Sequence, residues 1–144
     1  MRQIKKVLFI LFIMIGVSVN AIASNNNSGI GNDFNWDPIM NAIIKVESEG
    51  NNDAKHGASL GVLQITPILV TECNNILRRK KSKKRFSLSD RLSAKKSKEM
   101  FILIMNEFNK KRSAKEACRI WNGGINSKSV KQSYWDKFKK FYKK

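Results

Sequence analysis

The stretch Asp37-Pro38-Ile39-Met40-Asn41-Ala42-Ile43-Ile44-Lys45-Val46-Glu47-Ser48-Glu49-Gly50 indicates the fold class of this chain. Its apolar residues recur at helical spacing, Asp37 offers an N-cap acceptor, Pro38 suits a first turn and Gly50 is a stop signal. The sequence therefore predicts a helix from residue 37 to about residue 49. Such an amphipathic helix must bury its apolar face against further elements of the same domain.

The segments that follow carry similar helix signals. Further helices are predicted to begin at Thr66-Pro67, at about Ala94, at the capping box formed by Ser113 and Glu116, and at Ser127. The aromatic stripe of the last helix, which includes Tyr134, is interpreted as core. Segment 51–65 reads as a loop with at most a very short β-hairpin. Four to five helices with one irregular segment predict a mainly α single domain over residues 36–144.

The N-terminus has the three parts of a secretory signal peptide. A basic start, an apolar run over residues 7–17 and the small-x-small pattern Ala21-Ile22-Ala23 follow one another. We expect cleavage after residue 23, with residues 24–35 as a flexible leader; an uncleaved membrane anchor is the alternative. The mature protein is then expected in the periplasm or outside the cell.

Composition narrows the functional classes. The 144 residues include 28 Lys and Arg against 11 Asp and Glu, a formal net charge of +17. Seven of these cations fall within Arg78–Arg85, which is either a solvated loop or a segment that steers the protein to an anionic envelope surface. The signal peptide argues against a nuclear address, and no specific nucleic acid is expected.

The few metal-type ligands also restrict the possibilities. One His and two Cys exclude a zinc-ribbon framework, and no metal or cofactor is predicted. Cys73 and Cys118 fall on apolar helix faces, where a disulfide and two buried free thiols are equally compatible with the pattern. The protein is expected to act as a monomer.

Glu47 breaks the pattern of the first predicted helix. At 100° per residue it falls in the middle of the apolar face, near Ile43 and Ile44, whereas Glu49 lies about 200° away on the solvent side. Burial of a carboxyl group disfavours its charged form, so the pKa of Glu47 should rise. A carboxyl with a raised pKa next to a Gly-rich loop suits a general acid. The structural alternative is a capping or ion-paired Glu that closes an edge of the core.

Three blocks of the chain resemble the motifs of soluble lytic transglycosylase catalytic domains. They are Ile44-Lys45-Val46-Glu47-Ser48-Glu49-Gly50-Asn51, Gly61-Val62-Leu63-Gln64-Ile65-Thr66-Pro67 and Ala117-Cys118-Arg119-Ile120-Trp121-Asn122-Gly123-Gly124. The blocks come in the order of the family and span about 80 residues. The chain is similar to small exported members of this lysozyme-like superfamily. The resemblance implies a lysozyme-like fold that cleaves the glycan strands of peptidoglycan.

The resemblance also implies roles for individual residues. Glu47 corresponds to the single catalytic Glu that protonates the glycosidic oxygen, and Ser48 to a hydrogen-bonding Ser beside it. Gln64 corresponds to a Gln that lines the cleft, and Asn122 to an Asn near the catalytic Glu. Trp121 replaces a Tyr of the family, and its aromatic face suits packing against a sugar.

His56 falls where the family usually has Ser. It is interpreted as a surface-loop residue, with an acid–base role as the alternative.

The resemblance implies a lyase reaction on the MurNAc-GlcNAc β-1,4 bond. Glycosidases usually pair two carboxyl groups, but Glu49 points away from Glu47 and only Asp53 is nearby in sequence. A single-carboxyl route, which leaves 1,6-anhydro-MurNAc ends, is therefore favoured. A hydrolytic muramidase and a non-enzymatic cationic protein that binds envelope polymers or nucleic acid are the alternatives.

Overall fold

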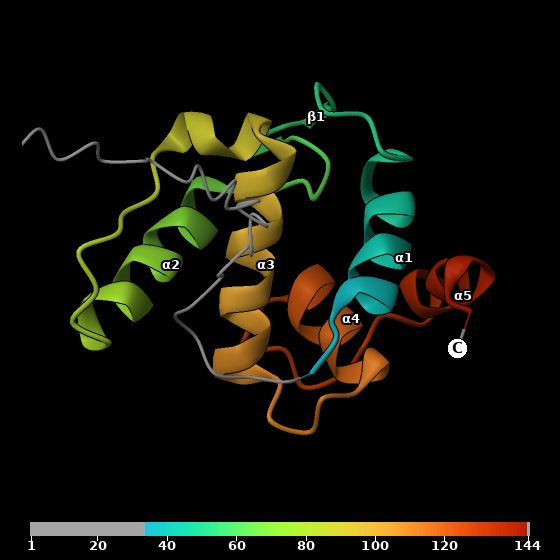
Figure 1. Cartoon of the computed structure of the whole chain (residues 1–144). Helices are drawn as coiled ribbons and strands as arrows, with labels where there is room; N and C mark the ends of the chain where they lie inside the picture. The colour runs from blue at the N-terminus through green and yellow to red at the C-terminus, as the bar shows by residue number, and fades with distance from the viewer. Residues whose placement is uncertain (1–33, 144) are drawn as a thin grey trace, which may run out of the picture. The chain divides into compact units, whose positions relative to one another are not determined.

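The computed structural model describes residues 34–143. The predicted signal peptide, residues 1–23, and most of the predicted leader, residues 24–35, lie outside these residues. In chain order the elements are helix α1 (Asp37–Ser48), strands β1 (Lys55–His56) and β2 (Ser59–Leu60), helix α2 (Pro67–Arg79), the 3-10 helix η1 (Leu88–Leu92), and helices α3 (Ala94–Phe108), α4 (Ala114–Gly123) and α5 (Gln132–Phe141) (Figure 1). The predicted mainly α fold with a short hairpin within residues 51–65 is confirmed.

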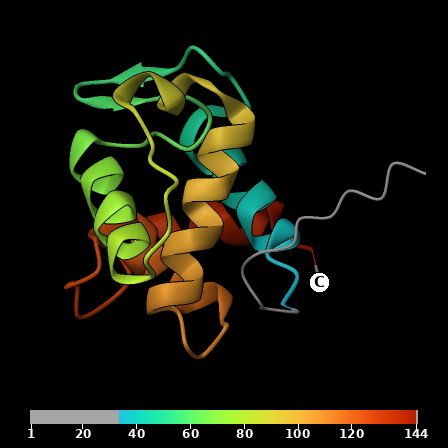
Figure 2. The ribbon, with the colours of Figure 1, turned by 60° about the vertical axis from the view of Figure 1, so that its left-hand side comes forward.

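The helices form two groups joined by aromatic side chains. Helices α1, α4 and α5 pack on one another, and α2, α3 and η1 form the other group (Figures 1 and 2). Phe101 of α3 lies between the groups, with its ring centroid 4.8 Å from that of Trp121 and 6.5 Å from that of Trp36. Phe101 is fully buried, so one continuous core holds α1, α3 and α4 together.

Helix α1 is fixed at both ends. The indole Nε1 of the buried Trp36 donates to Asn106 Oδ1 of α3 at 2.7 Å. The first backbone N–H of the helix, from Asp37, is accepted by Asn35 Oδ1 at 2.9 Å, so Asn35 and not Asp37 supplies the cap. At the other end Glu49 has a φ of 56°, which ends the helix one residue before the expected Gly50.

The hairpin is a single antiparallel pair. Lys55 lies opposite Leu60, and His56 lies opposite Ser59. An isolated bridge between Leu60 and Ile65 turns the chain back toward the start of α2. The hairpin and this bridge together reverse the chain direction twice between α1 and α2.

The hairpin is held against η1 by Arg91. This side chain is 8% exposed and donates hydrogen bonds to the carbonyl oxygens of Ala58, at 2.9 Å, and Ile65, at 3.3 Å. Gly61 lies under the same segment with a φ of 78°, and a Cβ at this position would overlap the carbonyl oxygen of Arg91. Only glycine combines this backbone angle with so close an approach.

Of the last two expected helix starts, one agrees with the structure and one does not. Ser113 caps α4 as predicted, since its Oγ accepts the Glu116 N–H at 3.2 Å. The predicted capping box is incomplete, because the Glu116 carboxylate binds the Arg119 guanidinium at 2.7 Å instead. The prediction that Ser127 caps the last helix is wrong: α5 begins at Gln132, with Lys131 at the N-cap.

All seven cations of the basic run are exposed, and part of the run is helical or ion-paired. Arg78 and Arg79 belong to the last turn of α2, where cations favourably face the helix C-terminus. Three of the seven cations form ion pairs, Arg79 with Glu72 and Glu107, Lys80 with Glu107, and Lys84 with Glu99. The other four form no ion pair with residues 34–143. Arg78 and Arg85 donate hydrogen bonds to Asn75 and to backbone carbonyl oxygens, respectively, whereas Lys81 and Lys83 have no side-chain partner among these residues.

The two cysteines are free thiols. Cys73 and Cys118 are both buried, and burial raises the pKa of each to about 12. In residues 34–143 no helix has the length and apolar character needed to cross a membrane.

Candidate active site

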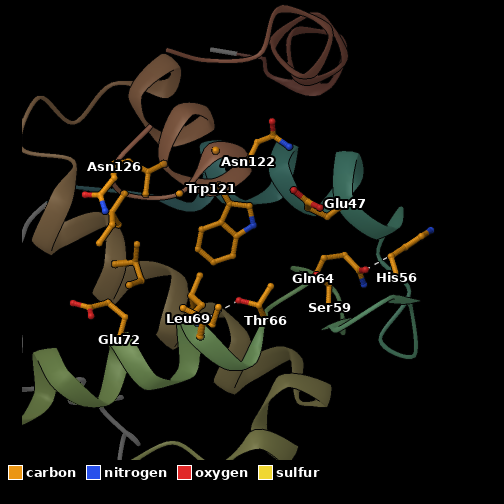
Figure 3. A pocket seen from close by; sticks show the side chains of 16 residues that line it. Glu47, His56, Ser59, Gln64, Thr66, Leu69, Glu72, Trp121, Asn122 and Asn126 are labelled. Carbon is orange, nitrogen blue, oxygen red and sulfur yellow. Dashed lines mark hydrogen bonds between the residues drawn. The ribbon is translucent and has the colours of Figure 1, made fainter. Parts of the chain in front are cut away.

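A cavity of about 610 Å³ opens where α1, α2, α4 and the hairpin meet. Its polar lining includes Glu47, His56, Gln64 and Asn122. Glu47 and Asn122 lie on one side, residues of α2 lie on the other, and Trp121 lies between them (Figure 3). The volume falls within the range of about 300–1,000 Å³ that is usual for ligand sites.

Glu47 is partly buried near the C-terminal end of α1. Burial raises the pKa of its carboxyl above the usual range, as its position on the apolar face predicts. A hydrogen bond from Tyr134 and the nearby His56 oppose this rise without cancelling it. None of the described residues forms an ion pair with Glu47, so the ion-paired form of the structural alternative is not found among them.

Tyr134 holds the Glu47 carboxyl in place. Its hydroxyl donates to Glu47 Oε1 at 2.6 Å, across 87 positions of sequence. Tyr134 is 7% exposed, and burial together with the adjacent carboxyl raises the pKa of the phenol, so it remains a donor. This bond supports the charged form of Glu47 and fixes one oxygen, which leaves Oε2 for a ligand.

Gln64 is locked by its backbone contacts. Its Nε2 donates to the carbonyl oxygens of Ala54 and Gly61, both at 2.9 Å, which orients the amide oxygen toward His56. His56 Nδ1 lies 3.1 Å from that oxygen and must therefore carry the proton. His56 is an exposed residue of β1, as expected for a surface position, but it also lines the cavity.

Trp121 and Asn122 come from the last turns of α4. The indole Nε1 of Trp121 donates to the carbonyl oxygen of Leu63 at 3.1 Å, and its ring packs on Phe101. The ring is thereby held with its orientation fixed at the cavity wall. The side chain of Asn122 is exposed and has no hydrogen-bond partner within residues 34–143, so its amide is free for a ligand.

Ser48 does not join this arrangement. Its Oγ donates to the carbonyl oxygen of Val62 at 2.8 Å and accepts from the Gly50 N–H at 3.1 Å. It neither bonds the Glu47 carboxyl nor lines the cavity, so the structure does not bring Ser48 together with the other candidate site residues. Ser48 instead joins the end of α1 to the segment that carries Gln64.

The acidic residues near the cavity differ in their exposure, in whether they line the cavity and in their partners. Asp53, the expected candidate for a second carboxylate, is exposed and does not line the cavity. Glu72 of α2 does line it, at the opposite end from Glu47 (Figure 3). The Glu72 carboxylate is engaged by Arg79 and by the Asn75 amide, both at 3.3 Å. Glu47 lines the cavity with a carboxyl whose pKa is raised by burial, so it is the candidate general acid of this site.

Sequence reasoning missed two residues of this site. Tyr134 is buried, as expected of a core residue, but its hydroxyl also reaches the Glu47 carboxyl, which the pattern of the stripe did not indicate. Glu72 carries no pattern signal, because an acid on the open face of a helix is ordinary. Residues 34–143 contain no cluster of three or more His, Cys, Asp or Glu side chains suited to a metal ion.

Comparison of the chain with models of protein families, with curated proteins and with solved structures finds no match in any of the three. The chemistry of the site must therefore be argued from its own geometry.

Proposed function

We propose that this protein is an exported lytic transglycosylase that cleaves the MurNAc-GlcNAc β-1,4 bond of peptidoglycan. The observation that carries the proposal is the carboxyl of Glu47, whose pKa burial raises and which the Tyr134 hydroxyl orients at 2.6 Å beside an open cavity. A protonated, oriented carboxyl next to a sugar-sized cavity with an aromatic wall is what general acid cleavage of a glycoside requires.

In the first step Glu47 donates its proton to the glycosidic oxygen as the C1–O bond breaks. Negative charge then develops on the Glu47 carboxyl while positive charge develops on the sugar ring. The hydrogen bond from Tyr134 strengthens as the carboxylate forms, since hydrogen bonds to charged groups are the stronger ones. Tyr134 is therefore a positioning residue whose effect is largest in the transition state.

In the second step the Glu47 carboxylate accepts the proton of the sugar's own 6-hydroxyl, whose oxygen bonds to C1. The leaving sugar has gained the first proton, the carboxyl has regained its own, and no water is consumed. The product is a 1,6-anhydro ring on the muramyl residue. Trp121 offers its ring to the sugar, and Asn122 and Gln64 flank Glu47 with polar groups.

Hydrolysis is the second candidate function, because Glu72 places a second carboxylate in the cavity lining. A two-carboxyl hydrolase needs a second carboxylate free to act on a water or on C1. Glu72 is instead bonded to Arg79 and Asn75, which favours the lyase route.

The deciding experiment pairs a Glu47→Gln variant with analysis of the products. Clearing of a peptidoglycan zymogram should be lost in this variant while its unfolding transition is retained, because the amide still accepts from Tyr134 but donates no proton. Mass spectrometry of strands cut by the natural protein should find muramyl ends lighter by one water. Reducing muramyl ends as first products would replace the lyase by the hydrolase, and undiminished clearing by Glu47→Gln would refute both.

A further inference from the structure

A second cavity, of about 220 Å³, also has Glu47 in its lining. It shares Glu47 and Asn122 with the first cavity and is completed by Val46 and by side chains of α5 and its N-cap. The catalytic carboxyl thus lines two cavities. A polymer that is cut at Glu47 must extend past the bond on both sides, and the second cavity offers room beside Glu47 for one of these parts.

The second cavity differs from the first in its charge. Lys131 and Lys137 line it together with Ser133, and Glu47 is its one acidic residue among those described. Neither lysine ammonium forms an ion pair or hydrogen bond within residues 34–143. Lys139 on the same helix shows the contrast, since it pairs with Asp136 at 2.9 Å.

Lys131 and Lys137 share one side of α5 and its N-cap with Tyr134, which binds Glu47. Lys131 and Lys137 lie three positions before and three positions after Tyr134, so all three fall on neighbouring turns of one side of α5. Tyr134 anchors this side to Glu47 at 2.6 Å. The N-terminus of α5 faces the same region and adds its partial positive charge. The cavity therefore presents two uncompensated cations next to the proposed site of cleavage.

We propose that the second cavity binds a carboxylate carried by the muramyl sugar beside the bond that is cut. This inference rests on the proposed function and names a feature of its substrate. A muramyl residue carries a lactyl group at O3, which ends in a free carboxylate or continues into a peptide that bears carboxylates. A GlcNAc residue carries none. The pair of lysines thus distinguishes muramyl glycan from neutral glycan of the same length.

The test measures binding in the Glu47→Gln background, so that no ligand is cut. Three tetrasaccharides serve as probes: an alternating GlcNAc-MurNAc chain with peptides, the same chain with free lactyl groups, and neutral chitotetraose. Lys131→Gln/Lys137→Gln should weaken binding of a carboxylate-bearing probe by about three- to thirtyfold, as expected for two partly exposed ion pairs. Chitotetraose binding should be unchanged.

A matched pair of substitutions controls for net charge. Lys95→Gln/Lys115→Gln removes two exposed lysines that line neither cavity, and it should leave the affinity for all three probes unchanged. The effect of the cavity lysines should also shrink in high salt, because charges at a partly exposed site are screened.

The outcomes separate the two proposals. A loss confined to the peptide-bearing probe assigns the carboxylate to the peptide, and a loss on both muramyl probes assigns it to the lactyl group; either supports the site. An equal loss on chitotetraose, an equal loss in the control pair, or no loss overturns it. Selective binding by a natural protein that cuts no peptidoglycan would refute the proposed reaction and leave the carboxylate site standing.

Discussion

Replacement of Tyr134 by Phe removes one oxygen atom from the site and leaves the packing of the ring intact. The lost atom is the donor of the 2.6 Å hydrogen bond to Glu47 Oε1. The neighbouring core, including the stacked rings of Phe138 and Trp135, should be undisturbed. The variant therefore tests how far this bond supports the charge that forms on Glu47.

The size of the effect follows from the change in charge on Glu47 during the first step of the proposed reaction. A hydrogen bond to a charged group contributes about 1.5–3 kcal/mol, and one between neutral groups about 0.5–1.5 kcal/mol. The bond should thus strengthen by about 1–1.5 kcal/mol as Glu47 loses its proton. Since about 1.36 kcal/mol is tenfold in rate, Tyr134→Phe should slow cleavage about five- to twelvefold at low pH.

The pH dependence gives a second, independent signature. Burial raises the pKa of Glu47 and the Tyr134 bond lowers it, so loss of the bond should raise this pKa further. In the proposed reaction Glu47 acts in its protonated form, so activity should fall as pH rises through its pKa. The alkaline limb of kcat/KM should therefore move to higher pH in Tyr134→Phe.

The assay is release of soluble fragments from purified peptidoglycan, measured across pH for three proteins. Tyr142→Phe is the matched control, because the Tyr142 ring also stacks on Phe138 and its hydroxyl has no partner within residues 34–143. It should keep both the rate and the pH profile of the natural protein. An unchanged rate in Tyr134→Phe, or an alkaline limb that moves to lower pH, would refute the role given to this bond.

Three further outcomes are expected. Gly61→Ala should unfold at a much lower denaturant concentration, because the added Cβ overlaps a backbone carbonyl. Gly57→Ala, where φ is 57° and the surrounding space is open, should lose only about 1–2 kcal/mol of unfolding free energy. Equal losses of stability in the two variants would contradict this. Lys81→Gln/Lys83→Gln should flatten the salt dependence of cleavage if these unpaired cations steer the protein to the wall, and an unchanged slope would show the basic run to be structural. Glu72→Gln should keep more than about a tenth of the activity, since removal of a true second carboxylate costs far more.

Most of the fold was predictable because its signals are local. Helical periodicity and the Ser113 cap depend on residues a few positions apart, and α3 and α4 lie where the pattern places them. The failures arose at ends governed by distant partners. Ser127 resembles an N-cap in sequence, yet α5 begins five residues later, where its aromatic face meets α1.

The candidate site divides in the same way. The apolar face of α1 by itself indicated that Glu47 is buried and that its pKa is raised. The predicted Gln64, Trp121 and Asn122 meet around one cavity with it, whereas Ser48 turns to the backbone of Val62. Spacing on one helix shows which way a residue faces, but it cannot show which atom will accept its hydrogen bond.

The sequence alone determined a mainly helical domain in which the carboxyl of Glu47 lies on the apolar face of a helix. Only the tertiary structure decided that Tyr134 holds this carboxyl, that Glu72 lines the same cavity, and that Lys131 and Lys137 line a second cavity with Glu47. The physical reason is the range of the interactions. Helix propensity and capping act within a few residues, whereas the bond between Glu47 and Tyr134 spans 87 positions and exists only when α5 packs on α1.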